Sequence, residues 1–204
     1  MGQRKALSVL FADIGGVLIE NPWIAVAAGL STTFGLDRAQ VFHDLDLLSR
    51  DLDKGEIDLR SFNEKLSHAA GRDIPQEYFE KLLLDESPRR ILPVWNSLFR
   101  LRSSAALKII ALSNMSRDYW STLETRFHIS SLFDATVLSY ELGVIKPDPT
   151  IFKIALERAR SPAHLCMFMD DSAANIRSAK TLGLNTHLVT DPKETSAFLL
   201  SLGT

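Results

Sequence analysis

Short apolar runs alternate with amphipathic stretches along most of the chain. The runs with the length and β-branched content of buried strands are 9–12, 107–112, 135–138, 165–169 and 186–189. The stretches with apolar residues at helical spacing that follow residue 86 are 91–102, 116–127, 149–159, 173–182 and 192–200. Strands that alternate with helices predict an α/β fold, in which right-handed crossovers build a parallel sheet flanked by helices.

Residues 21–86 break this alternation, because they carry helical spacing throughout and no strand pattern. Asn21 followed by Pro22 is typical of the first residues of a helix. Three more helical segments follow before residue 86. An all-helical insertion after the first strand predicts two domains: an α/β core of residues 1–20 and 87–204, and a helical cap of residues 21–86.

Composition supports a folded chain and narrows its partners. With 46% hydrophobic and 24% charged residues, the 204-residue chain has enough apolar side chains for a sizeable core. The formal net charge of −2 argues against binding to nucleic acid or to an anionic membrane. Cys166 is the only cysteine, so no internal disulfide forms and we expect a cytoplasmic protein, either a monomer or a homodimer.

Polar groups end three of the predicted strands. Asp13 follows the first run, Ser113 follows the second, and Asp170 and Asp171 follow the fourth. Parallel strands end at one edge of the sheet, where open α/β sheets bind ligands. Converging carboxylates repel each other unless a cation lies between them. Oxygen ligands without a cluster of His or Cys favour Mg²⁺ over zinc.

Other residues near these strand ends suit a phosphate site. Gly15 and Gly16 let the backbone turn sharply and approach a ligand closely. Lys146, in the segment GVIKPDP, supplies a compact positive charge. Ser113 and Asn114 add hydrogen-bond donors for phosphoryl oxygens. Taken singly, each has a plain structural explanation, since a lysine is usually a surface residue and these polar residues also cap helices. The occurrence of all these residues together, near the ends of the predicted strands, indicates a ligand site more specifically than any one of them.

The segments DIGGV, LSN, IKPDP and MDDSAANI, in this order, resemble the haloacid dehalogenase superfamily, and mainly its phosphatase branch, over essentially the whole chain. The resemblance implies a Rossmann-like core with an inserted helical cap, a Mg²⁺ cofactor and a small phosphorylated substrate. It also implies that Asp13 is the nucleophile that forms an aspartyl-phosphate. Ser113 then binds the phosphate beside the Asn114 backbone, and Lys146 balances the charge.

The same resemblance implies a set of metal ligands. Asp171 is expected to be the principal acidic ligand of Mg²⁺, with Asp170 close to the metal directly or through water. Asp13 and the backbone carbonyl of Gly15 complete the expected set. Asn175 lies one helical turn past Asp171 on the same helical face, where it is placed to orient a carboxylate.

One position departs from the pattern of the family. Its phosphatases usually carry a second Asp two residues after the nucleophile, which protonates the leaving group and then activates water. Here that residue is Gly15. General acid help typically contributes about 10²–10⁴-fold. We therefore expect slow turnover of simple alkyl phosphates and better turnover of substrates with good leaving groups, such as sugar 1-phosphates or prenyl and terpenoid diphosphates.

Residues 21–36 carry no charge, and they include Trp23. This run is either the core of the cap, which we favour, or an apolar pocket in which Trp23 contacts the leaving group. Three other functions stay open: a related terpene cyclase or lyase that binds diphosphate, a haloacid dehalogenase, and a catalytically impaired binding protein. A dehalogenase needs no metal, so the paired carboxylates at 170 and 171 argue against it. Gly15 is the only feature that supports a catalytically impaired binding protein.

Overall fold

One parallel sheet organises the chain in the computed structural model, which describes residues 7–104 and 107–202. Within these residues the sheet has five strands in the order β3–β2–β1–β4–β5. The strands are β1 (Val9–Ala12), β2 (Lys108–Ser113), β3 (Ala135–Leu138), β4 (Cys166–Asp170) and β5 (Asn185–Leu188). The predicted α/β fold with a Rossmann-like parallel sheet is confirmed.

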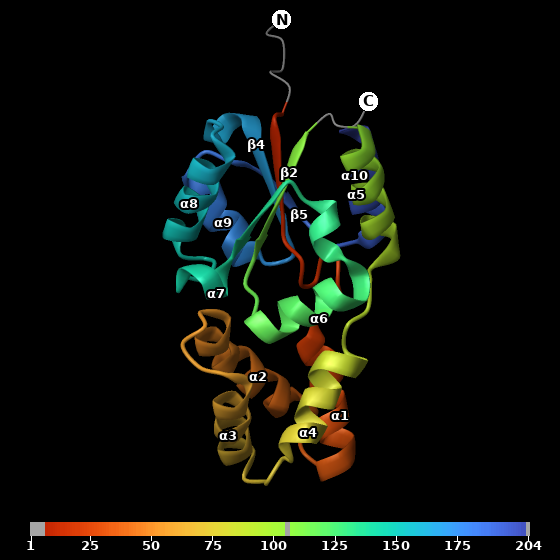
Figure 1. Cartoon of the computed structure of the whole chain (residues 1–204), viewed down its shortest axis with the longest axis vertical. Helices are drawn as coiled ribbons and strands as arrows, with labels where there is room; N and C mark the ends of the chain where they lie inside the picture. The colour runs from red at the N-terminus through yellow and green to blue at the C-terminus, as the bar shows by residue number, and fades with distance from the viewer. Residues whose placement is uncertain (1–6, 105–106, 203–204) are drawn as a thin grey trace, which may run out of the picture.

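Helices cover both faces of this sheet. Figure 1 shows α8 and α9 on one side of it and α5 and α10 on the other. The helices between and after the strands are α5 (Leu92–Ser104), α6 (Arg117–Phe127), α7 (Ser139–Leu142), α8 (Pro149–Ala159), α9 (Ala173–Thr181) and α10 (Pro192–Ser201), with 3₁₀ turns at Ile129–Leu132 and Ala163–Leu165. The sequence pattern missed α7 and the two 3₁₀ turns, because a single turn carries no measurable periodicity.

Successive side chains of β1 point to opposite faces of the sheet and are buried on both. Val9 and Phe11 belong to a cluster that includes side chains of α8 and α9. Leu10 and Ala12 belong to a second cluster, with side chains of α5, α6 and α10. Burial on both faces explains why this strand reads as an unbroken apolar run. Cys166 is completely buried, in the first of these clusters.

Residues 21–86 form helices that group beyond one end of the sheet, in the lower part of Figure 1. They are α1 (Pro22–Phe34), α2 (Arg38–Asp53), α3 (Leu59–Ala70) and α4 (Gln76–Glu80), and α4 continues into a π-helical turn, η1 (Lys81–Glu86). The division into core and cap domains stays a prediction. Residues 1–6, 105–106 and 203–204 of the predicted core lie outside the described residues. No helix in the described part of the chain is long and apolar enough to cross a membrane.

A glycine allows α1 to pack closely against η1. Helix α1 continues past Gly29 to Phe34 and ends at Gly35, whose φ is 66°. A Cβ atom at Gly29 would lie 2.5 Å from Cδ2 of Leu82, in η1. Gly29 therefore costs helix propensity but permits this contact between the two segments.

Three stacked aromatic rings form the centre of the helical region. Phe62 of α3 lies between Trp23 of α1, at 5.5 Å between ring centroids, and Phe79 of α4, at 5.4 Å. Phe62 and Phe79 are fully buried, whereas Trp23 is only partly buried. Core packing accounts for one face of Trp23, in line with the interpretation that we favoured from the sequence.

We predict that Phe62→Ala lowers the free energy of unfolding by about 3–5 kcal/mol, because it leaves a cavity between two rings that backbone shifts cannot fill. Chemical denaturation of both proteins measures the difference. Phe99→Ala is the control: Phe99 is 56% exposed, so its loss should change stability by less than about 0.5 kcal/mol. Equal effects of the two substitutions would contradict the packing described here.

Candidate active site

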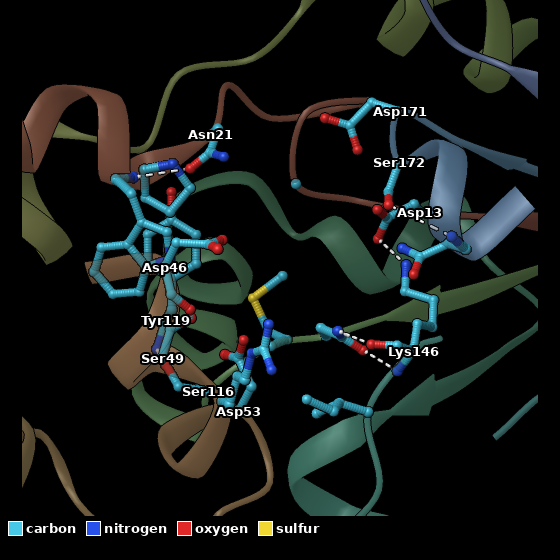
Figure 2. A pocket seen from close by; sticks show the side chains of 18 of the residues that line it. Asp13, Asn21, Asp46, Ser49, Asp53, Ser116, Tyr119, Lys146, Asp171 and Ser172 are labelled. Atoms are coloured by element: carbon cyan, nitrogen blue, oxygen red, sulfur yellow. Dashed lines mark hydrogen bonds and ion pairs between the residues drawn. The ribbon is translucent and has the colours of Figure 1, made fainter. Parts of the chain in front are cut away.

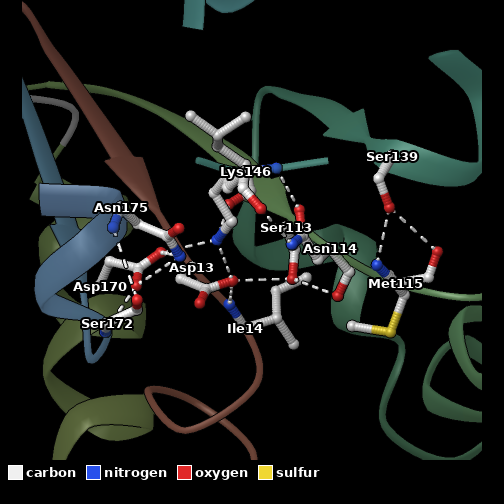
Figure 3. Close-up of polar contacts among 11 residues, drawn as sticks. Asp13, Ile14, Ser113, Asn114, Met115, Ser139, Lys146, Asp170, Ser172 and Asn175 are labelled. Carbon is white, nitrogen blue, oxygen red and sulfur yellow. Dashed lines mark hydrogen bonds and ion pairs between the residues drawn. The ribbon is translucent and has the colours of Figure 1, made fainter. Parts of the chain in front are cut away.

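The carboxyl ends of β1, β2 and β4 meet at one edge of the sheet, as predicted. Asp13 directly follows β1, and its N–H donates to the carbonyl of Met169 at 3.0 Å. Ser113 ends β2 and Asp170 ends β4. Because β1 pairs with both of these strands, the three polar side chains are brought together (Figure 3).

Three donors hold one oxygen of Asp13. Its Oδ1 accepts hydrogen bonds from the Ile14 N–H and the Ser113 hydroxyl, each at 2.8 Å, and lies 2.8 Å from the Lys146 ammonium. Among the described residues, the hydrogen bonds and the ion pair of the Asp13 side chain all fall on this oxygen. The carboxylate is thus fixed in direction, with Oδ2 left for a bond to a ligand.

Lys146 is a buried cation between two carboxylates. It is 3% exposed, and its Nζ lies 2.8 Å from Asp13 Oδ1 and 2.7 Å from Asp170 Oδ2. It also donates to the carbonyl of Leu112 at 3.0 Å. Burial by itself lowers the pKa of Lys146, but the two carboxylates outweigh burial and raise it. The plain interpretation of Lys146 as a surface lysine is therefore wrong.

The side chain of Asn114 holds the backbone of Lys146. Its Oδ1 accepts from the Lys146 N–H at 2.8 Å, and its Nδ2 donates to the Lys146 carbonyl at 3.0 Å. This pair of bonds connects the end of β2 to the segment that carries the lysine. Because both ends of the Asn114 side-chain amide bond to Lys146, only the backbone of Asn114 is available to contact a phosphate.

Asp170 is fully buried, and hydrogen-bond donors contact both of its carboxylate oxygens. Its Oδ1 accepts from the Ser172 N–H at 2.8 Å, and Nδ2 of Asn175 lies 3.0 and 3.1 Å from its two oxygens. Lys146 supplies the remaining contact. The side chain of Asn175 thus contacts one of the predicted carboxylates, that of Asp170.

Asp171 is exposed at the mouth of the same site, and Gly16 makes room for it. The φ of Gly16 is 74°, and a Cβ atom there would lie 2.0 Å from Asp171 Oδ2. One carboxylate oxygen each from Asp13, Asp170 and Asp171 lies within 4.8 Å of the others. Any larger residue at position 16 would push these groups apart.

The charges at this site are unbalanced. Burial raises the pKa of Asp13 to about 8; the nearby Asp170 and Asp171 add to the increase, whereas Lys146 opposes it. Burial and the Asp170 carboxylate also raise the pKa of Asp171. Three carboxylates face one ammonium, so a divalent cation with a preference for oxygen ligands would remove the repulsion. These donors fit Mg²⁺.

A pocket of about 560 Å³ opens in front of this cluster (Figure 2). The predicted site residues that line it are Asp13, Gly15, Trp23, Asn114, Lys146, Asp171 and Asn175. The predicted residues that do not line it are Gly16, Ser113 and Asp170. Ser113 contacts the lining residue Asp13, and Asp170 contacts the lining residues Lys146, Ser172 and Asn175.

Helix α2 supplies a polar wall that the sequence analysis missed. Asp46, Ser49, Arg50 and Asp53 all line the pocket. Their spacing of three, one and three residues places them on one helical face. That spacing was visible in the sequence, but the sequence does not show what the polar face of a helix looks toward. Other lining residues that were missed include Met115, Ser116 and Tyr119.

Comparison with known proteins identifies relatives over most of the chain. The profile of the haloacid dehalogenase-like hydrolase family matches residues 8–183. Acyl-CoA dehydrogenase family member 10 of Mus musculus is 28% identical over 94% of this chain, which spans only 18% of that protein. D-ribitol-5-phosphate phosphatase of Bacteroides thetaiotaomicron is 23% identical, over 85% of this chain and 87% of the relative.

Solved structures share the fold. A haloacid dehalogenase family enzyme from Bacteroides thetaiotaomicron, in complex with magnesium and inorganic phosphate, superposes with a TM-score of 0.71 at 24% sequence identity. The match covers 91% of this chain and 95% of that one.

We predict that Lys146→Met lowers the free energy of unfolding of the metal-free protein by about 3–5 kcal/mol, because it leaves two buried carboxylates without their cation. Urea unfolding measures the change.

Lys65→Met is the matched control. Lys65 forms an ion pair of 3.0 Å with Asp51, but both side chains are nearly half exposed, so the loss should stay below about 1 kcal/mol. If both lysine substitutions cost the same, Lys146 does not compensate the buried charge.

Proposed function

Because the chain belongs to the haloacid dehalogenase-like hydrolase family, we propose that it is a Mg²⁺-dependent phosphatase of a small, polar phosphorylated metabolite. The observation that carries this proposal is the cluster of Asp13, Asp170 and Asp171 around the buried Lys146. An oriented carboxylate, a neighbouring cation and a set of oxygen ligands for a metal are the groups that enzymes use for phosphoryl transfer.

The proposed metal ligands are Asp13, Asp171 and the carbonyl of Gly15, with Asp170 close by. When bound, Mg²⁺ would neutralise the carboxylates and the charge of the transferred phosphoryl group. The Bacteroides enzyme of the same fold, in complex with magnesium and inorganic phosphate, supports the choice of this metal. The raised pKa of Asp13 fits it as well, since three ionised carboxylates here need more positive charge than Lys146 alone supplies.

Asp13 is the proposed nucleophile. Its carboxylate would attack phosphorus and form an aspartyl-phosphate, which water then hydrolyses to inorganic phosphate. The Ile14 N–H and the Ser113 hydroxyl fix the direction of the attacking group. Lys146, held in place by Asn114, would stabilise negative charge on the transferring phosphoryl group.

Residues 21–86 are the proposed cap, and they make the leaving-group side of the pocket polar. Ser49, Arg50 and the two aspartates of α2 offer hydrogen-bond partners to hydroxyl groups, whereas a prenyl chain would leave them unpaired. The likeness to a D-ribitol-5-phosphate phosphatase supports a sugar or polyol phosphate. Trp23 then contacts the carbon skeleton of the substrate.

We predict that the protein releases inorganic phosphate from a panel of organic phosphates only with Mg²⁺, and that Asp13→Asn reduces the rate by on the order of 10³-fold or more. Chelation of the metal should abolish the release. Colorimetric phosphate measurement with and without Mg²⁺ checks both statements.

Asp191→Asn is the control for this experiment, because Asp191 caps α10 away from the pocket and Asn caps a helix equally well. Activity without metal would contradict a phosphatase of this type and favour a dehalogenase. The absence of phosphate release from every compound would instead favour a binding protein.

We further predict that kcat/KM for sugar or polyol phosphates exceeds that for prenyl diphosphates by at least about tenfold. One polar group left unpaired costs about 1–3 kcal/mol, and 1.4 kcal/mol is a factor of ten. Steady-state kinetics with equal Mg²⁺ compare the two classes. Equal or better use of prenyl diphosphates would show that the α2 wall does not select the substrate.

A further inference from the structure

The loop that follows the nucleophile supplies no acid to this pocket. Position 15 is a glycine, and a Cβ atom there would meet no other atom within 4 Å, so the space beside Asp13 stays open. We propose that Asp53, the last residue of helix α2, is the general acid and base of the reaction. This inference rests on the proposed phosphatase function.

Asp53 lies across the pocket from the nucleophile. Both residues line the same cavity, and Figure 2 shows Asp53 and Asp46 on one side of it, with Asp13 and Lys146 on the other. A phosphate ester attacked by Asp13 extends its leaving group away from that residue, because attack and departure are roughly in line. The leaving oxygen therefore faces the α2 wall.

The end of α2 is fastened to the core at this residue. The buried hydroxyl of Ser139 donates to the carbonyl of Asp53 at 2.5 Å and accepts from the Met115 N–H at 2.9 Å. Met115 follows Asn114, so the Ser139 side chain connects the end of α2 to the loop that positions Lys146. Figure 3 shows the bond between Ser139 and Met115. A Cβ atom at Gly55 would lie 2.9 Å from the carbonyl of Tyr140, which marks a second close contact of the same turn.

The surroundings of Asp53 suit a group that both gives and takes a proton. Burial raises its pKa to about 7; the ammonium of Lys146 opposes this and the Asp46 carboxylate adds to it. Both protonation states are then populated near neutral pH, which is what general acid–base catalysis requires. The charged and titratable groups that line the pocket with it are Asp13, Asp46, Arg50, Tyr119, Lys146 and Asp171, and those on α7, packed against α2, are Tyr140 and Glu141.

The proton follows a closed path in two steps. In the first, a carboxylate oxygen of Asp13 bonds to phosphorus, the ester P–O bond breaks, and the leaving oxygen takes the bonding electron pair and the proton of Asp53. In the second, the Asp53 carboxylate takes a proton from water as the water oxygen bonds to phosphorus. The P–O bond to Asp13 breaks, inorganic phosphate departs, and Asp53 is protonated again.

Two probes that differ by one methylene test the role of Asp53. 4-Nitrophenyl phosphate releases a stabilised phenolate that needs little protonation, whereas 4-nitrobenzyl phosphate releases an alkoxide that needs it. With Mg²⁺ present, Asp53→Asn should lower kcat/KM about 10²–10⁴-fold for the benzyl ester and less than about tenfold for the phenyl ester. The variant would then show the leaving-group preference that Gly15 alone predicts.

Asp51→Asn is the matched control. Asp51 lies two residues earlier on α2, pairs with Lys65 and does not line the pocket, so its loss should affect neither probe. Asp53→Glu keeps a carboxyl group and should recover part of the benzyl activity. If Asp53→Asn does not fold, Asp53→Glu decides the question, because a displaced carboxyl should impair the benzyl ester selectively.

Equal losses on both probes would overturn the role of Asp53, since a merely structural residue affects both esters alike. A selective loss in Asp46→Asn but not in Asp53→Asn would assign the proton to Asp46 and overturn it as well. If the unmutated protein releases no phosphate from either ester with Mg²⁺, the proposed function itself fails, and this inference fails with it.

Discussion

The site depends on one buried ammonium group. Lys146 lies between the carboxylates of Asp13 and Asp170 with almost no exposure to water, and burial of any one of these charges alone would be costly. The ammonium and the two carboxylates can be buried only as a group, at the edge of the sheet where three strands end. This explains why the Asn114 side chain holds both the N–H and the carbonyl of Lys146: a small shift of the lysine would leave a carboxylate unpaired.

The same balance determines where a metal and a substrate fit. Lys146 compensates for the inner carboxylates, and Asp171 adds a further negative charge at the open side. Gly16 permits this crowding because it has no Cβ atom. The remaining negative charge thus faces the pocket, so a cation bound there stabilises the protein and also prepares the site for a phosphate that would otherwise be repelled.

The sequence predicted the sheet and the inner cluster because both are encoded locally. Asp13 and Asp170 each end an apolar run, and parallel strands bring such ends together whatever the details of the helices. The α2 wall was not predictable in the same way, since Asp53 reaches the site only through the packing of α2 and its bond to Ser139, 86 residues away in sequence. The close approach of the π-helical turn to Gly29 was likewise not predictable, because it brings together two segments that are far apart in the sequence.

Placement of the acid on α2 would separate two tasks that a single loop can combine. The sheet fixes the proposed nucleophile and its neighbouring cation, whereas the proton would come from a helix joined to the core by Ser139 and the turn at Gly55. Proton transfer then requires that α2 be seated against α7, while attack by Asp13 does not. Because the α2 wall that would recognise the leaving group also carries Asp53, a substrate that pairs with this wall orders the acid that its own departure needs. The contacts that select the substrate would then also position the carboxyl group that protonates its leaving oxygen. Binding energy on the leaving-group side would in this way contribute to the rate of the reaction.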